Sequence, residues 1–416
     1  MRRRIVFHVF AILALLPVYC LEALTGEVVD ATTMRPIHGA LVTSGSAVVA
    51  TNDSGVFHFD GTCDRIGVRA YGYLRTYVNV PSSKSATIEV KLTPFSPKAL
   101  YLSGFGIGSS ALREPALRLL QQTDLNSLVI DVKGDRGLIP YRSTVPLAVI
   151  AGANRTITIP EINGLVTALH ARGIYLIARI VVFKDDPVAS AKPDWDVLTA
   201  SDTIWRDGEG LAWTDPSKQE VWEYNLDIAV EAARNGFDEI QFDYVRFPDA
   251  VGLRYSVPNT QENRVRVITQ FFEEARKRLA PYNVFLSADI FGYACWNLND
   301  TDIGQKLESI AASVDYICPM LYPSGFQYGI PGYRIPVAHP YEIPRSSLER
   351  ARERTSLPSI RFRPWLQAFR DYAFDRRLFG PAEIRSQIRA AEDFGSDGWM
   401  LWNPHNVYSR DGLTHE

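Results

Sequence analysis

Two aspartates stand near the carboxyl ends of segments whose residues alternate between apolar and polar. Asp243 lies in DEIQFDYVRFP (Asp238–Pro248), and Asp289 lies in FLSADIFG (285–292). The period of two predicts β-strands that carry apolar residues on one face and the carboxylate on the other. Two facing carboxylates whose pKa values are pushed apart can protonate a leaving oxygen and attack an anomeric carbon. We therefore predict that Asp243 is a nucleophile or base and that Asp289 is a general acid.

The same alternation places other polar and aromatic residues on the face that carries these aspartates. The interior of a purely structural barrel is filled with branched apolar side chains, so polar positions on six or more strands favour a site. Aromatic faces also stack on sugar rings. The pattern predicts one carbohydrate-binding cavity at the carboxyl ends of the strands, with these candidate residues: Asp131, Lys133, Arg179, Gln241, Arg246, Tyr293, Tyr322, Trp365, Gln367, Trp402 and Asn403.

Three other interpretations of these residues stay open. Asp131 and Arg179 could form a structural salt bridge that ties strands together. Asp131, Asp243 and Asp289 could serve as oxygen ligands in a metal-assisted hydrolase, although no His lies near them in the sequence. A protein with the same cavity could also bind glycans without cleaving them. The chain has no CxxC, HxH or HExxH motif, so we predict neither a metal site nor a cofactor.

From residue 98 onward, apolar strand segments alternate with helical patterns. Eight such units predict an α/β fold, a TIM (β/α)8 barrel with extended loops. An open doubly wound sheet is the alternative, but GFGIG (104–108) lacks the GxGxxG turn expected after the first strand of such a sheet. The predicted strands are Ala99–Ser103, Ser127–Lys133, Tyr175–Phe183, Glu239–Phe247, Phe285–Phe291, Tyr316–Tyr322, Trp365–Phe369 and Gly398–Asn403.

The segment before the barrel has a different character. Met1–Arg4 is basic and Ile5–Leu16 is a short apolar run, which predicts a signal peptide or an uncleaved N-terminal anchor within residues 1–23. Short alternating runs between turn residues predict a small all-β sandwich over residues 24–93. Residues 94–97 form a short proline-marked linker, so we expect the barrel to fold without the sandwich. We expect the protein to be secreted, periplasmic or held in the cell envelope.

Charge and cysteine usage restrict the possible partners. The 416 residues carry a net charge of −3 with no basic block beyond the N-terminus, which argues against nucleic acid as a partner. Cys295 and Cys318 could pair, but Cys318 falls inside a predicted strand, so we predict buried thiols. The predicted partner is a polysaccharide or oligosaccharide substrate, and a membrane only through the possible N-terminal anchor.

Two resemblances extend these predictions. Residues 25–92 resemble the carboxypeptidase regulatory-like domain in TGEVVDATTMRPIHGALV, TNDSGVFHF, AYGYL and IEVKL, and such domains are usually spacers or adhesive modules. Residues 128–408 resemble a glycoside hydrolase family of secreted bacterial barrel proteins, still defined mainly as a domain of unknown function. This second resemblance implies a TIM barrel that hydrolyses glycosidic bonds, and it rests on VIDVKGDRGLIPY, IARIVVFKDDPVA, DEIQFDYVRFPD, SADIFGY, VDYICPMLYPSGF, RPWLQAF and GWMLWNP.

The chain departs from the pattern of that family at one position. The family usually has an acidic residue where this chain has Gly134, within DVKGDRG. If that acid helps catalysis in the family, Asp131 or Asp135 must carry its role here.

Overall fold

The computed structural model describes residues 23–60, 63–81 and 88–413. Eight parallel strands close into a barrel in the order β10-β11-β12-β13-β14-β15-β8-β9, which confirms the predicted TIM fold. The strands are β8 (Lys98–Leu102), β9 (Ser127–Lys133), β10 (Tyr175–Val181), β11 (Glu239–Asp243), β12 (Phe285–Phe291), β13 (Tyr316–Met320), β14 (Trp365–Gln367) and β15 (Trp399–Trp402).

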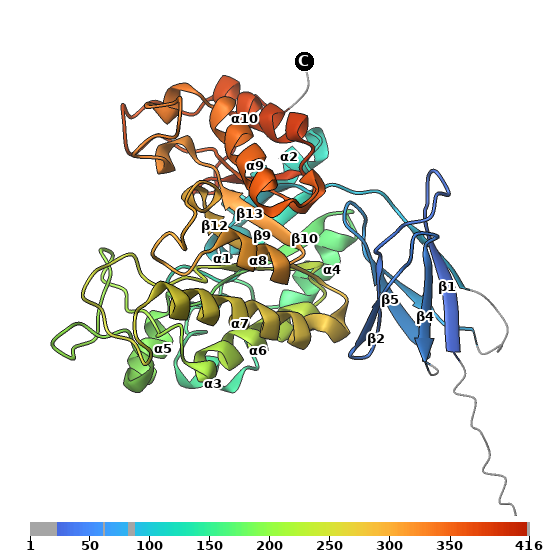
Figure 1. The fold of residues 1–416 in the computed structure, drawn as a ribbon, viewed down its shortest axis with the longest axis horizontal. Coiled ribbons are helices and arrows are strands. Elements are labelled where there is room, and N and C mark those ends of the chain that lie inside the picture. The colour runs from blue at the N-terminus through green and yellow to red at the C-terminus, as the bar shows by residue number, and fades with distance from the viewer. Residues whose placement is uncertain (1–22, 61–62, 82–87, 414–416) are drawn as a thin grey trace, which may run out of the picture.

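Helices surround this barrel and cover its apolar outer surface (Figure 1). Connections of a dozen or more residues, mostly helical, are what parallel neighbouring strands require. The helices are α1 (Gly104–Gly108), α2 (Ser110–Gln122), α3 (Pro146–Ile150), α4 (Ile162–His170), α5 (Asp186–Ala191), α6 (Gln219–Arg234), α7 (Gln261–Leu279), α8 (Leu307–Ser313), α9 (Glu342–Thr355) and α10 (Pro381–Phe394).

Alternation along the strands sorts side chains between the helical layer and the barrel interior. Leu128, Ile130 and Val132 of β9 join the large core beneath the helices. Val129 of the same strand joins a separate cluster together with Tyr101, Tyr175, Ile177, Phe285, Cys318 and Met400. This second cluster is the barrel interior, so the predicted inward and outward faces are correct over most of each strand.

Strand β11 ends at Asp243, four residues earlier than the sequence predicts. The next residue, Tyr244, has a φ of 52°, in the left-handed region that bulky residues rarely adopt. This conformation turns the chain away from the sheet directly after the aspartate. The carboxylate of Asp243 is therefore the last side chain of its strand, at the rim of the barrel.

A β-sandwich precedes the barrel, as predicted. Its three-stranded sheet, β4-β1-β7, packs on a four-stranded sheet, β3-β2-β5-β6, around an apolar core that includes Val28, Val42, Phe57 and Val68. The strands are β1 (Ala23–Asp30), β2 (Leu41–Ser44), β3 (Ala47–Ala50), β4 (Val56–Asp60), β5 (Arg65–Arg69), β6 (Thr76–Asn79) and β7 (Ile88–Leu92).

The sandwich packs against the end of the barrel where the strands begin (Figure 1). The Tyr71 ring lies 5.7 Å from the Tyr316 ring, and the Phe95 ring lies 5.3 Å from the Tyr175 ring, measured between centroids. Phe95 belongs to the predicted linker, and its backbone N–H also donates to Gly72 O. Residues 94–97 are thus part of a packed interface and do not form a free connection.

Polar contacts reinforce this interface. Arg75 Nη2 donates to the backbone carbonyls of Gly236 and Phe237, each at 3.0 Å, and Arg75 Nε binds Asp238 Oδ1 at 3.1 Å. These three partners lie in the turn that leads into β11. The sandwich therefore supports the strand that carries Asp243, at the opposite end from the carboxylate.

Two further sequence predictions concern the N-terminal segment and the cysteines. The predicted signal or anchor lies almost wholly outside the described residues. Among the described residues, no helix is long and apolar enough to cross a membrane. Cys295 and Cys318 are free and buried, which confirms the prediction of buried thiols.

Candidate active site

Asp243 is held rigidly at the carboxyl end of β11. Its Oδ1 accepts a hydrogen bond from the backbone N–H of Tyr244 at 2.6 Å, and the left-handed turn at Tyr244 makes this short contact possible. Its Oδ2 accepts from both Nε and Nη2 of Arg179, at 2.9 and 2.6 Å. Both oxygens are fixed by donors that favour the charged carboxylate.

Arg179 is the centre of a cluster of carboxylates. Besides Asp243, its guanidinium binds Asp131 Oδ1 at 2.7 Å and Asp135 Oδ1 at 2.8 Å. Burial alone would lower the pKa of Arg179, but the attraction of these carboxylates outweighs burial and raises it well above the usual value. The Trp402 ring lies 4.9 Å from the guanidinium carbon, in cation–π range. The predicted ion pair between Asp131 and Arg179 is present, within a larger network.

Asp289 lies inside the barrel, as its strand position predicts, but beneath the cavity. Its Oδ1 accepts from Trp365 Nε1 at 2.7 Å, whereas its buried Oδ2 has no hydrogen-bond partner and lies 4.0 Å from Arg179 Nε. Burial, followed by repulsion from Asp243, raises the pKa of Asp289 well above its ordinary value. The surroundings of Asp289 therefore favour its protonated form.

Asp131 is buried next to Asp135 and below it. Tyr101 OH donates to Asp131 Oδ2 at 2.6 Å, and burial raises the pKa of Asp131 to about 6 against the opposing effect of Arg179. At Gly134, a β-carbon would lie 3.2 Å from Asp131 Oδ2. The position at which the family has an acid therefore faces Asp131, and here Asp135 is the neighbouring carboxylate that reaches Arg179.

A cavity of about 170 Å³ opens above this cluster. It joins six of the predicted residues to four that the predicted site does not contain. Neither Asp131 nor Asp289 reaches the cavity wall, contrary to our expectation, because both side chains lie in the layer below. The wall consists of the predicted Arg179, Asp243, Arg246, Tyr322, Trp365 and Trp402, together with Asp135, Tyr244, Phe291 and Met320.

Lys133, a predicted substrate-binding residue, does not line this cavity. The pairing of β9 with β10 shifts by one residue, so that Arg179 faces Asp131 whereas Ile180 faces Lys133. Ile180 points into the helical layer, and the side chain of its partner Lys133 points to the same side of the sheet. A β-bulge of this kind reverses the side-chain alternation beyond it, which periodicity in the sequence does not reveal.

The buried ammonium group of Lys133 has its own set of partners behind β10. Its Nζ forms an ion pair with Asp185 Oδ2 at 2.5 Å and donates to Asn225 Oδ1 at 2.8 Å. It also donates to the backbone carbonyls of Val181 and Val182. These contacts make Lys133 a structural residue between the barrel and α6.

Three other predicted residues lie outside the cavity. Gln241 is deeper in the barrel interior, where its Nε2 lies 3.4 Å from the sulfur of Met400. Gln367 Nε2 donates to Ser324 Oγ at 2.7 Å and so anchors the loop after β13. Asn403 Nδ2 donates to the backbone carbonyl of Ala368, which follows β14, and to that of Val407, in the loop after β15. None of these three side chains lines the cavity, and the buried Oε1 of Gln241 has no hydrogen-bond partner. A fourth, Tyr293, lines a neighbouring pocket.

Tyr101, Tyr244 and Phe291 are site residues that the sequence analysis missed. Tyr101 carried a signal, because it occupies the inward position of the strand segment KALYL and is the polar aromatic residue there. Phe291 shares the inward parity of Asp289 on β12, whereas Tyr244 occupies a position that strand alternation assigns to the outer face. The turn that begins at Tyr244 overrides this alternation.

The position of these groups defines the class of protein. In TIM-barrel enzymes the catalytic residues come from the ends of several strands at the carboxyl face, and Asp243, Arg179 and Trp402 meet at that face here. Residues 99–408 match the family described as "Putative glycosyl hydrolase domain" (DUF4015), which spans nearly the whole barrel. The chain belongs to this family. No curated protein matches the chain.

Solved structures include both a close and several distant relatives. A hypothetical protein from Ruminiclostridium thermocellum is 35% identical over a match that covers 46% of this chain and 96% of that chain, with a TM-score of 0.41. The PgaB (BpsB) glycoside hydrolase domain from Bordetella bronchiseptica is 16% identical, covering 78% of this chain and 100% of that chain, with a TM-score of 0.55. Alpha-L-fucosidase isoenzyme 2 from Paenibacillus thiaminolyticus is 14% identical, covering 77% and 47%, with a TM-score of 0.50. The two distant structures share the fold.

Proposed function

We propose that this protein hydrolyses glycosidic bonds of a polysaccharide and that Asp243 is the carboxylate that acts at the anomeric carbon. The observation that carries the proposal is the fixed position of Asp243 on the cavity wall, where Arg179 and the Tyr244 amide hold its two oxygens. A carboxylate held in this way is oriented before substrate arrives. This is a requirement for a nucleophile or for a base that activates water.

Two residues can supply the proton to the departing oxygen. Asp289 has the raised pKa that a general acid needs, but its side chain lies beneath the cavity. Asp135 lines the cavity, with its carboxylate on the same Arg179 nitrogen as that of Asp243, at 2.8 and 2.6 Å. Two carboxylates bound to one nitrogen lie close together, as the paired carboxyl groups of glycosidases do.

The aromatic walls of the cavity suit a sugar ring. Trp402 and Trp365 lie edge to face, with ring centroids 5.5 Å apart, and Tyr322 lines the same cavity. Apolar ring faces beside a few fixed polar groups are the usual composition of a carbohydrate or small-molecule site. The predicted signal or anchor in residues 1–23 completes the proposal, because it would bring the enzyme to polysaccharides of the cell envelope.

The test is an activity screen on polysaccharides and aryl glycosides, with the wild type beside Asp243→Asn. We expect kcat of the variant to fall roughly a hundredfold to ten-thousandfold or more, because acid–base or covalent assistance is lost. Substrate affinity should stay within about tenfold, because the other contacts to the bound substrate remain. Asp64→Asn, an exposed substitution in the sandwich, is the matched control and should behave as wild type. Equal turnover by Asp243→Asn would contradict the assignment.

A series of aryl leaving groups decides which residue donates the proton. An acidic phenol leaves without protonation, so a variant that lacks the donor should keep most of its activity on that substrate and lose activity on poor leaving groups. Asp289→Asn and Asp135→Asn are the two variants to compare. The one whose rate depends more steeply on the leaving-group pKa identifies the donor.

Glycan binding without turnover is the second candidate function. The observation that favours it is the ion-paired state of the cluster, since one guanidinium forms ion pairs with Asp131, Asp135 and Asp243 together. A wild type that binds oligosaccharides but never cleaves them, with Asp243→Asn binding equally well, would establish this function and exclude the first.

A further inference from the structure

A second pocket adjoins the cavity that contains Asp243. Its volume is about 560 Å³, and it shares Phe291 and Met320 with that cavity, so the two lie side by side. The cavity at Asp243 is smaller than the roughly 300–1,000 Å³ of most ligand sites, whereas the second pocket falls within that range. A ligand with several units would fill both.

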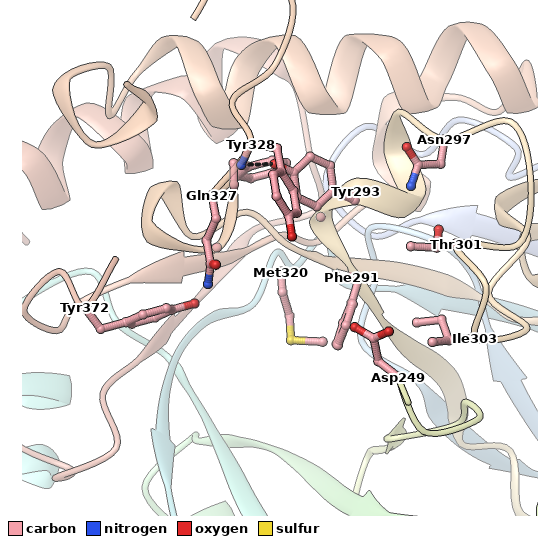
Figure 2. Close-up of a pocket in the computed structure, with 13 residues that line it drawn as sticks. Asp249, Phe291, Tyr293, Asn297, Thr301, Ile303, Met320, Gln327, Tyr328 and Tyr372 are labelled. Carbon is pink, nitrogen blue, oxygen red and sulfur yellow. Dashed lines mark hydrogen bonds between the residues drawn. The ribbon is translucent and has the colours of Figure 1, made fainter. Parts of the chain in front are cut away.

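The walls of the second pocket present aromatic rings that neighbouring groups hold in place (Figure 2). Tyr328 is 94% exposed, and its backbone N–H donates to Tyr293 OH at 2.9 Å. On another side, Tyr372 is 46% exposed and stacks on Phe369 with an interplanar angle of 10°. Exposed aromatic rings cost solvation free energy unless a partner covers them, so two such rings at one pocket indicate a binding surface.

Asp249 supplies the charged group of this pocket. In Figure 2 its side chain lies across Phe291 and Met320 from Tyr328. It is exposed and makes no hydrogen bond or ion pair with any residue in the ranges that the structure describes. A carboxylate without protein partners can accept hydrogen bonds from sugar hydroxyls or bind an ammonium group, and it repels anionic groups.

We propose that this pocket is a subsite for a second sugar unit of the same chain, and that the unit is neutral or carries an amino group but is not anionic. The proposal rests on the proposed function, because it places the bond to be cleaved at Asp243 and the neighbouring unit against Tyr328 and Asp249. The protein would then prefer longer oligosaccharides, because a substrate that spans both pockets gains contacts that a single sugar lacks.

The experiment compares kcat/KM for an aryl monosaccharide with that for oligosaccharides of two to six units, in neutral, amino and uronic acid series. Tyr328→Ala should lower the ratio of oligosaccharide to monosaccharide kcat/KM by about tenfold, since stacking area is lost. Tyr328→Phe keeps the ring and should keep most of that ratio. Asp64→Asn is the control outside both pockets.

Asp249→Asn separates the two kinds of sugar. A large fall in the amino series, which added salt diminishes, assigns an ammonium ligand, whereas a small fall in the neutral series assigns hydroxyl groups. Uronic acid chains should be poor substrates for wild type and better ones for Asp249→Asn. The proposal would be overturned if Tyr328→Ala left the ratio of oligosaccharide to monosaccharide kcat/KM unchanged. It would also be overturned if the wild type preferred anionic chains.

Calorimetric binding of the same oligosaccharides separates this proposal from the proposed function. If wild type cleaves nothing but binds oligosaccharides, and Tyr328→Ala weakens that binding, the subsite stands while the hydrolase assignment fails. If wild type cleaves the aryl monosaccharide and gains nothing from longer chains, the hydrolase assignment stands and the subsite fails. Absence of any binding to neutral and amino oligosaccharides also overturns the subsite.

Discussion

Arg179 donates two hydrogen bonds to a single oxygen of Asp243, from Nε at 2.9 Å and from Nη2 at 2.6 Å. The same guanidinium binds Asp131 and Asp135, so one side chain fixes the position of three carboxylates. Planar guanidinium groups suit this arrangement because their donors point in fixed directions. Asp243 is therefore oriented by the barrel before any substrate binds.

Loss of Arg179 should harm stability and turnover together. Arg179→Ala leaves buried carboxylates without a counter-charge, which costs about 3–5 kcal/mol in the free energy of unfolding. Arg179→Lys keeps one charge but cannot bond three carboxylates, so it should recover only part of that loss. Urea denaturation measures the effect, with Arg385→Ala as the control because its pair with Glu392 is partly exposed and worth about 1 kcal/mol or less. An Arg179→Ala protein as stable as wild type would refute the central role of this side chain.

The buried carboxyl of Asp289 should make stability depend on pH. Its folded-state pKa lies well above the ordinary value of 3.8, so the native protein keeps a proton that the unfolded chain releases above about pH 4. Its contribution to stability is therefore present at low pH and is lost as pH rises from about 4 toward the folded-state pKa. Asp289→Asn imitates the protonated acid and should gain in Tm relative to wild type between about pH 4 and pH 8. Calorimetry across this range, with Asp64→Asn as reference, checks the sign; a constant difference in Tm would contradict it.

Lys133 provides a test of the corrected strand register. Lys133→Met leaves Asp185 buried without its cation, which should cost about 3–5 kcal/mol of stability. The double variant Lys133→Met/Asp185→Asn removes the lone charge and should regain part of this loss. In both proteins KM should equal that of wild type, measured well below the unfolding temperature. A selective rise in KM without loss of stability would instead return Lys133 to the substrate site.

The contacts between the two domains predict that the barrel depends on the sandwich. Residues 98–416 alone would expose the Tyr175 and Tyr316 rings and the turn that Arg75 binds, so we expect this fragment to aggregate or to melt at a lower temperature than the whole chain. This is the opposite of the separable domains expected from the proline-marked linker. Arg75→Ala in the full chain should lower Tm, whereas Arg35→Ala, exposed in the sandwich, should not. A stable, soluble barrel fragment would restore the modular view.

The fold class could be predicted from the sequence because its determinants are local. Strand alternation in IQFDYV and LSADIF, and helices between such segments, depend on residues a few positions apart. The inward direction of Arg179, Asp243 and Asp289 follows from the same local alternation. For this reason the closed barrel and its preceding sandwich agree with what the sequence predicts, and both aspartates point into the barrel.

Which of the inward residues reach the cavity depends on contacts that form only in the folded barrel. A one-residue shift between β9 and β10 moved Lys133 into the helical layer, and the left-handed turn at Tyr244 ended β11 early. The two carboxylates also differ in their depth along the barrel axis. Asp289 lies below the cavity wall, whereas Asp135 is part of it. Bulges, turns and strand stagger depend on contacts between distant segments, and alternation in a single strand carries no information about them.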